Sequence, residues 1–108
     1  MISERVSDVG VASAEAEQRA VVRAGDYLNK LTGERIEREC REQLARGCRE
    51  IVVDLADTET INSIGISILL GVIDSASGSG AKVVFAGVKE STIELFEMLG
   101  LTRHVTIN

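Results

Sequence analysis

Two short apolar runs most strongly limit the folds open to this chain. EIVVDL at residues 50–55 and AKVVFAG at residues 81–87 place apolar side chains at consecutive positions instead of alternating them with polar ones. Continuous apolar strands are typical of parallel sheets that are covered by helices. Strands that alternate with helical segments predict a parallel sheet with right-handed crossovers. We therefore expect an α/β fold with a mostly parallel central sheet.

Residues 25–47 predict a loop and then a helix that ends at Gly47. Thr32 is the expected N-cap of this helix, and Glu34 and Glu37 favour its positive end. The buried stripe of the helix is expected to comprise Ile36, Cys40 and Leu44.

A second helix is expected from Ser63 to about Ser77, and a third over residues 89–101. On the second helix, the side chains expected to face inward are Ile64, Ile68, Leu69, Val72 and Ile73. Weak alternation from Val6 to Ala12, followed by RAVVRAG at residues 19–25, predicts an N-terminal hairpin, and HVTI at residues 104–107 predicts a short final strand. Residues 1–108 then form one domain with three main helices.

Charge and composition exclude several classes of partner. The net charge of −5 argues against nucleic-acid binding, which needs a clustered basic face, and against an electrostatic anchor to anionic lipid. No apolar stretch approaches the roughly 18 residues of a membrane span, and the N-terminus has no signal-peptide core. We therefore expect a cytoplasmic protein with no membrane partner, either a monomer or a weak dimer.

The cysteines and the histidine do not predict a metal site, and no cofactor is expected. Cys40 and Cys48 are not spaced as zinc ligands, and the only histidine, His104, has no evident partner. Cys40 is expected to be a small buried hydrophobic residue. The GSGAK segment at residues 78–82 follows a helix and precedes a strand, so it predicts a turn and not a phosphate-binding loop.

Three carboxylates lie in or just after the end of the first apolar run, the carboxyl end of a central strand, where α/β proteins tend to place their sites. They are Asp54, Asp57 and Glu59. A receiver-like phosphotransfer protein or a divalent-metal site could use such a group. A receiver would also need an acidic pair after an earlier strand and a lysine that ends a later strand. Residues 25–26 provide one acid, and Lys89 comes a few residues late. The alternative is a solvated loop whose acids help to cap the next helix.

Ser63 lies where a buried strand passes into an apolar helix. Taken alone, it is an ordinary N-cap serine. Ser63, Ser67 and Gly71 recur every four residues, so they line one helix face that could serve for close packing or for binding a partner. No Gly-x-Ser-x-Gly elbow and no suitably placed histidine supports nucleophilic catalysis, and we expect no enzyme.

The arrangement REIVVDLADTETINSIGISILLGVI, followed by SGAKVVFAG and LFEMLGL, resembles the STAS domain of bacterial anti-sigma-factor antagonists over essentially the whole chain. Its most specific part is the Asp-Ser-Ser/Thr-Gly-Leu step between strand and helix, which matches residues 62–66 here. The resemblance implies that Ser63 is phosphorylated by a partner kinase that is itself the anti-sigma factor, and that a serine phosphatase removes the phosphate. Only the unphosphorylated form would bind the kinase and release the sigma factor.

The sequence departs from the family pattern at three positions. Asn62 stands for the acid before the serine, Asn29 for the acid after an earlier strand, and Ile64 for the second hydroxyl residue. Other family members act as constitutive scaffold subunits of sensory complexes or as subunits of transporters, and such an adaptor is the alternative function. The residues expected to contact the partner are Asn29, Asp57, Asn62, Ile64, Gly65, Ser67 and Gly71.

Overall fold

The computed structural model describes residues 19–103 and 105–108. Its elements, in chain order, are β1 (Arg19–Arg23), β2 (Tyr27–Leu28), α2 (Lys30–Ala45), β3 (Glu50–Asp54), β4 (Thr60–Ile61), α3 (Ser63–Gly78), β5 (Lys82–Ala86), α4 (Glu90–Met98), the 3₁₀ helix η1 (Leu101–Arg103) and β6 (Thr106–Ile107). The strand expected over residues 6–12 lies outside the described residues, as does His104.

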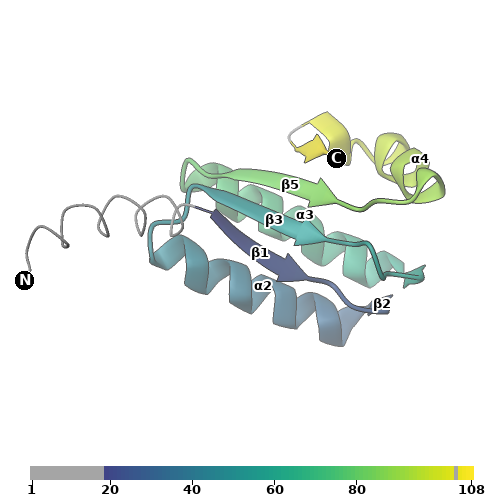
Figure 1. Cartoon of the computed structure of the whole chain (residues 1–108), viewed down its shortest axis with the longest axis horizontal. Coiled ribbons are helices and arrows are strands. Elements are labelled where there is room, and N and C mark those ends of the chain that lie inside the picture. The colour runs from purple at the N-terminus through teal and green to yellow at the C-terminus, as the bar shows by residue number, and fades with distance from the viewer. Residues whose placement is uncertain (1–18, 104) are drawn as a thin grey trace, which may run out of the picture.

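The two apolar runs form the central strands β3 and β5 of a four-stranded sheet with the order β1-β3-β5-β6. All three pairings in this sheet are parallel, which confirms the expected fold class (Figure 1). The final strand, β6, lies within the predicted segment. A second, two-stranded parallel pair, β2–β4, was not expected from the sequence.

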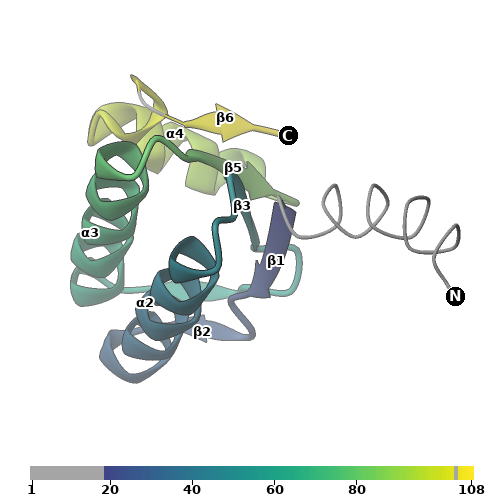
Figure 2. The ribbon, with the colours of Figure 1, turned by 90° about the vertical axis from the view of Figure 1, so that its left-hand side faces the viewer.

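Helices α2 and α3 lie side by side over one face of the sheet (Figure 2). Val22, Val53 and Phe85 share one register row across β1, β3 and β5, and all three belong to the hydrophobic core. Helix α4 lies beyond β5, and its Phe96 ring contacts Phe85 at a centroid distance of 5.2 Å. Aromatic pairs at such distances add to the stabilisation that comes from apolar burial. Within the described residues, no helix has the length and apolar character required to span a membrane.

Helix α2 begins three residues before the expected position. Asn29, not Thr32, is its N-cap: the Asn29 side chain accepts from the Thr32 N–H at 3.1 Å, and the Thr32 hydroxyl accepts from the Asn29 N–H at 2.9 Å. This reciprocal capping box satisfies two donors at once. Glu34 and Glu37 therefore lie beyond the first turn, which contains no acid. The stop is as predicted, with Gly47 at a positive φ of 93°.

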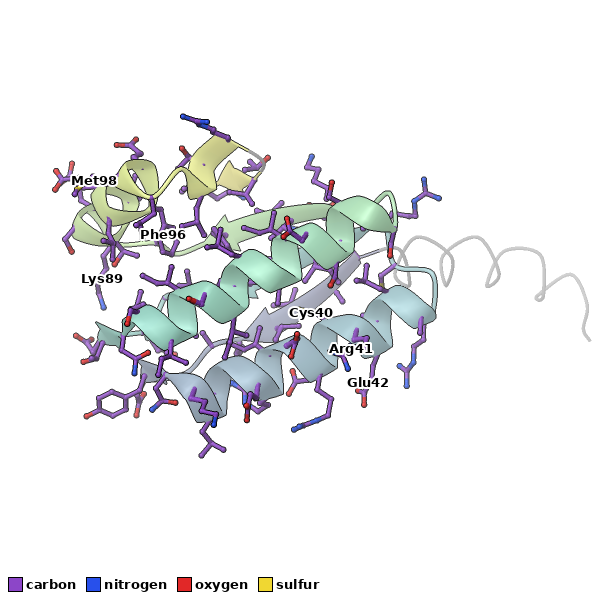
Figure 3. All side chains as sticks on the ribbon, turned by 180° about the vertical axis from the view of Figure 1, so that it is seen from behind. Cys40, Arg41, Glu42, Lys89, Phe96 and Met98 are labelled. Carbon is purple, nitrogen blue, oxygen red and sulfur yellow. The ribbon has the colours of Figure 1, made fainter. Side chains whose placement is uncertain are left out.

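The buried stripe of α2 is confirmed, since Ile36 and Cys40 are buried and Leu44 packs against the core. In Figure 3, Cys40 points toward the interior, whereas Arg41 and Glu42 on the next positions of α2 point away. Burial, followed by the negative charges of Glu39 and Glu37, raises the pKa of the Cys40 thiol from 9.0 to about 12. The thiol is therefore protonated at neutral pH and is not a nucleophile.

The expected inward face of α3 is partly wrong. Leu69, Val72 and Ile73 are buried as predicted, whereas Ile64 is 50% exposed. The first buried residues of α3 are instead Gly65 and Ile66, so the first buried large side chain comes two residues after Ile64. Two positions along a helix correspond to a rotation of about 200°, so Ile64 and Ile66 lie on nearly opposite faces.

Candidate functional site

The short β2–β4 pair brings the first turns of α2 and α3 to the same end of the domain. Leu28 pairs with Ile61, and the Asn62 N–H donates to the Leu28 carbonyl oxygen at 2.9 Å. The residues that follow this pair, Asn29 and Asn62, are the N-caps of the two helices. The two asparagines therefore lie at the same end of the domain, next to the β2–β4 pair.

Asn62 fixes the first turn of α3. Its backbone is extended, with φ −106° and ψ 171°, and its side-chain oxygen accepts from the Gly65 N–H at 2.8 Å. The Asn62 carbonyl oxygen accepts from the Ile66 N–H at 3.1 Å. The N–H groups of Ser63 and Ile64 have no acceptor within the helix, because the first N–H groups of an α-helix precede its hydrogen-bond ladder.

Ser63 is the first residue of α3, and its side chain is exposed. This confirms the predicted start of the helix at Ser63, although Asn62 and not Ser63 is the cap. Ser67, one turn later, is also exposed. Gly71 is half-buried, and no atom lies within 4 Å of the position that a Cβ would occupy there. The stripe of small residues therefore lies on the surface of α3 instead of packing inside the protein.

Gly65 has a different role from the other small residues of α3. It is buried, and a Cβ at this position would lie 2.6 Å from the Leu28 carbonyl oxygen. Glycine is therefore required for the close approach of α3 to the backbone of β2. It supports the surface around Ser63 and does not line that surface.

The loop that leads from β3 to this site is hydrogen-bonded to two neighbouring segments, which contain Gly25 and Lys89. Thr58 is the one buried polar side chain among the described residues, and its hydroxyl donates to the Gly25 carbonyl oxygen at 2.7 Å. The Lys89 ammonium group donates to the Thr58 carbonyl oxygen at 3.0 Å and to the Glu59 carboxylate at 3.2 Å. The loop therefore holds a defined path from the sheet to Asn62.

The three carboxylates of this loop have separate surroundings. The Asp54 carboxylate accepts from the Ala56 N–H at 2.9 Å, Glu59 pairs with Lys89, and Asp57 is exposed. In the part of the chain that the structure describes, no group of three or more His, Cys, Asp or Glu side chains could hold a metal ion. The lysine after β5 thus contacts Glu59, whereas the receiver-like hypothesis would use Asp54 and Asp57.

Comparison with known families identifies the fold. The sequence model of the STAS domain family matches residues 11–108, which is most of the chain. The chain belongs to the STAS domain family. No curated protein matches the sequence.

Solved structures share the architecture of this STAS domain at low sequence identity. The unphosphorylated form of the anti-sigma factor antagonist SpoIIAA is 13% identical, with a TM-score of 0.69 over 85% of this chain and 80% of SpoIIAA. The phosphorylated form from Bacillus is 15% identical, with a TM-score of 0.68 over 85% of this chain and 84% of that one.

Two further structures are similar in fold. The protein TM1081 of Thermotoga maritima is 23% identical, with a TM-score of 0.68 over 81% of this chain and 77% of that one. The STAS domain of a SulP transporter from Vibrio cholerae is 18% identical, with a TM-score of 0.65 over 80% of this chain and 66% of that one. At these identities the likeness establishes the fold.

Two exposed side chains near Ser63 were missed by the sequence reasoning. Tyr27 in β2 is 57% exposed, and Leu31 in the first turn of α2 is 76% exposed. The signal available in the sequence was a pair of large apolar residues that flank the Asn29 cap. Both residues lie at the end of the domain that carries Ser63.

Proposed function

We propose that this STAS domain is an anti-sigma-factor antagonist that is switched by phosphorylation of Ser63. The unphosphorylated domain binds a serine kinase that is also the anti-sigma factor, and this binding releases the sigma factor. The kinase then phosphorylates Ser63, and a serine phosphatase reverses the modification. In this scheme the domain acts in the cytoplasm as a substrate and binding partner, without enzymatic activity or a cofactor of its own.

The observation that carries the proposal is the exposed position of Ser63 as the first residue of α3. It matches the phosphorylated serine of the antagonists that the sequence resembles. The structural neighbours include SpoIIAA in both its unphosphorylated and its phosphorylated form. A serine in this place needs no internal base, because the catalytic groups belong to the kinase.

The start of α3 can accommodate a phosphate. The N–H groups of Ser63 and Ile64 lack acceptors within the helix, and the positive end of the helix dipole favours an anion. Asn62 adds no negative charge beside the serine. Phosphorylation therefore adds about −1.5 to −2 charge without requiring the helix to unfold.

The same phosphate would oppose a partner that docks over the outer face of α3. Between Ser63 and Asp74 this helix carries no charged residue, so its outer face is neutral before phosphorylation. A penalty of about 3 kcal/mol from the added dianion lowers affinity roughly a hundredfold, which suffices for a switch. The contact residues proposed for this surface are Asn29, Asp57, Asn62, Ile64, Ser67 and Gly71, supported from below by Gly65.

Phosphosite mapping tests the proposal. The serine kinases of the histidine-kinase-like ATPase type that the source genome encodes would each be incubated with the domain and ATP. We expect one of them to add one phosphate at Ser63, and we expect Ser63→Ala to abolish the modification while binding persists. Ser67, one turn further along α3, is the matched control. A phosphate at Ser67 or elsewhere would contradict the proposed site.

The second candidate function is a constitutive adaptor in a sensory or transport complex. The similarity to the STAS domain of a SulP transporter favours it. In that case Ser63 is only a residue of the helix start and stays unmodified. Partner binding that proceeds equally well with Ser63→Ala and Ser63→Asp, with no kinase acting on Ser63, would establish the adaptor instead.

A further inference from the structure

Three large apolar side chains are exposed where α2 and α3 begin. Tyr27, Leu31 and Ile64 are 57%, 76% and 50% exposed, and we call them the apolar end patch. They come from β2 and from the first turns of α2 and α3. Exposed apolar side chains that gather at one place mark interaction sites, and tyrosine is enriched among residues that dominate binding energy.

The fold itself gives no reason for apolar residues at these positions. Leu31 is 76% exposed, so it contributes little to the core. The first turn of a helix favours acidic side chains, so the helix dipole also gives no reason for leucine there. The cap of α2 is formed by Asn29 and Thr32, whose side chains are polar. Serine, glutamate or aspartate at position 31 would serve the helix equally well.

Hydrogen bonds connect the patch rigidly to the site of Ser63. The Thr32 hydroxyl donates to the Tyr27 carbonyl oxygen at 2.6 Å, which holds β2 against the first turn of α2. The Asn62 N–H donates to the carbonyl oxygen of Leu28, the residue after Tyr27. Tyr27 and Leu31 therefore lie at the same end of the domain as Ser63 and Ile64, where one partner can contact all four residues.

The surroundings of the patch specify the charge of its partner. The N–H groups of Glu59 and Thr60 both donate to the Asp26 carbonyl oxygen, so the loops that carry Asp26, Asp57 and Glu59 meet beside β2 and β4. All three acids are exposed, and Lys89 pairs with only one of them. An apolar surface bordered by acids is complementary to an apolar surface bordered by lysine or arginine.

We propose that the apolar end patch extends the kinase-binding surface beyond Asn29 and Ile64 to Tyr27 and Leu31, where it packs against an apolar area of the kinase that is flanked by basic side chains. This inference rests on the proposed function, because it assigns a second contact to the same partner. A second copy of this chain, with its net charge of −5, would bring acids against acids, and an anionic membrane would also be repelled.

Two variants and a matched control test the patch by calorimetric titration with the kinase that phosphorylates Ser63. Tyr27→Ser and Leu31→Ser remove patch side chains, whereas Met98→Ser removes an 83% exposed side chain from α4, on the opposite side of the domain from α2 (Figures 1 and 3). We expect each patch variant to weaken binding about tenfold and Met98→Ser to leave it unchanged. Binding of the unaltered domain should also weaken as salt is raised, because the flanking charges are exposed.

The outcomes separate this inference from the proposed function. If the kinase phosphorylates Ser63 and binds the patch variants as tightly as the unaltered domain, the patch has no part in kinase binding. The proposed phosphorylation switch is then unaffected. If none of the kinases binds or modifies the domain, both proposals fail. A dimer in sedimentation that Leu31→Ser dissolves, or binding to phosphatidylserine vesicles that Leu31→Ser abolishes, would assign the patch to another occupant. Circular dichroism confirms that each variant is folded.

Discussion

Helices α2 and α3 lie beside each other on the sheet, have the same length and begin with the same cap residue, but their outer faces differ. Half of the sixteen residues of α2 are charged, and its surface carries the pairs Arg35–Glu39 and Glu37–Arg41 at i,i+4 spacing. Asp74 is the only charged residue among the sixteen of α3. The outer face of α2 is suited to water, whereas that of α3 is suited to contact with another protein.

The two caps differ in the same way. Asn29 forms a reciprocal capping box with Thr32, and the Thr32 hydroxyl also donates to the Tyr27 carbonyl oxygen. These hydrogen bonds hold the first turn of α2 against β2. Asn62 makes a single side-chain bond, to the Gly65 N–H, and leaves Ser63 exposed beside it. One asparagine therefore serves mainly the fold, and the other also presents the candidate modification site.

The glycines of the two helices give the largest expected difference. Gly65→Ala places a Cβ 2.6 Å from backbone, which does not yield, so we expect a loss of about 3 kcal/mol in the free energy of unfolding. Gly33→Ala meets the Cδ1 atom of Ile68 at 2.8 Å, the end of a flexible side chain, and should cost less. Gly71→Ala meets no atom within 4 Å and should stabilise the domain by up to about 1 kcal/mol. Urea denaturation measures all three. Equal losses at Gly65 and Gly71 would show that α3 does not approach β2 closely.

Alkaline pH should act on α2 and not on α3, because only the buried stripe of α2 contains an ionisable group. Burial raises the pKa of Cys40 from 9.0 to about 12, so the folded state retains a proton that the unfolded state loses between these values. The stability due to the neutral thiol is complete below pH 9 and falls by about 1.4 kcal/mol per pH unit above it. The difference in unfolding free energy between the unaltered domain and Cys40→Ala, measured from pH 8 to 11, should shrink as pH rises. A difference that stays constant with pH would mean that the fold does not protect the Cys40 thiol from deprotonation.

Removal of the cap side chain should destabilise the domain more at the start of α2 than at the start of α3. Asn29→Ala breaks a two-way capping box, and we expect a loss of about 1–2 kcal/mol in the free energy of unfolding. Asn62→Ala loses one side-chain bond, and we expect about 1 kcal/mol. Thermal unfolding measures both. A larger loss at Asn62 than at Asn29 would contradict the expectation that the cap of α2 contributes more to stability than the cap of α3.

The smallest change in stability is expected when both caps become acids. Aspartate caps helices as well as asparagine does, so Asn29→Asp with Asn62→Asp should change the free energy of unfolding by only a few tenths of a kcal/mol. It restores the two acids of the family pattern, and if they assist the kinase, the rate of Ser63 phosphorylation should rise. Radiolabelled phosphate transfer measures this rate. An unchanged rate would show that the acids have no part in the reaction.

The order of strands and helices was predictable because the consecutive apolar residues of β3 and β5 indicate buried strands directly. The β2–β4 pair was not, since two residues per strand carry no periodicity and the pairing joins segments about thirty positions apart. Ile64 was misplaced because α3 is apolar over more than one face, so periodicity alone does not select the buried stripe. The cap of α2 was missed although the sequence contains a capping-box spacing, with Thr32 three residues after Asn29.

The candidate site was located from sequence to the extent that it depends on chain neighbours. Ser63 follows a buried strand and opens an apolar helix, a step that a local pattern can identify. The exposure of Tyr27 and Leu31 depends on how α2 and β2 pack against α3, which a local pattern does not contain. Asn29 and Asn62 lie at the same end of the domain because β2 pairs with β4 and Asn62 bonds to Leu28, which no local pattern contains.

In the proposed switch, a phosphate on Ser63 separates this STAS domain from its kinase. The most direct measurement is the dissociation constant of the kinase for two forms of the domain, unmodified and phosphorylated on Ser63, determined by calorimetry at one salt concentration. We predict that phosphorylation raises the dissociation constant about a hundredfold. Ser63→Asp should produce a smaller increase, because a carboxylate carries less charge and fewer acceptor oxygens than a phosphate. Equal dissociation constants for the two forms would contradict the proposed switch.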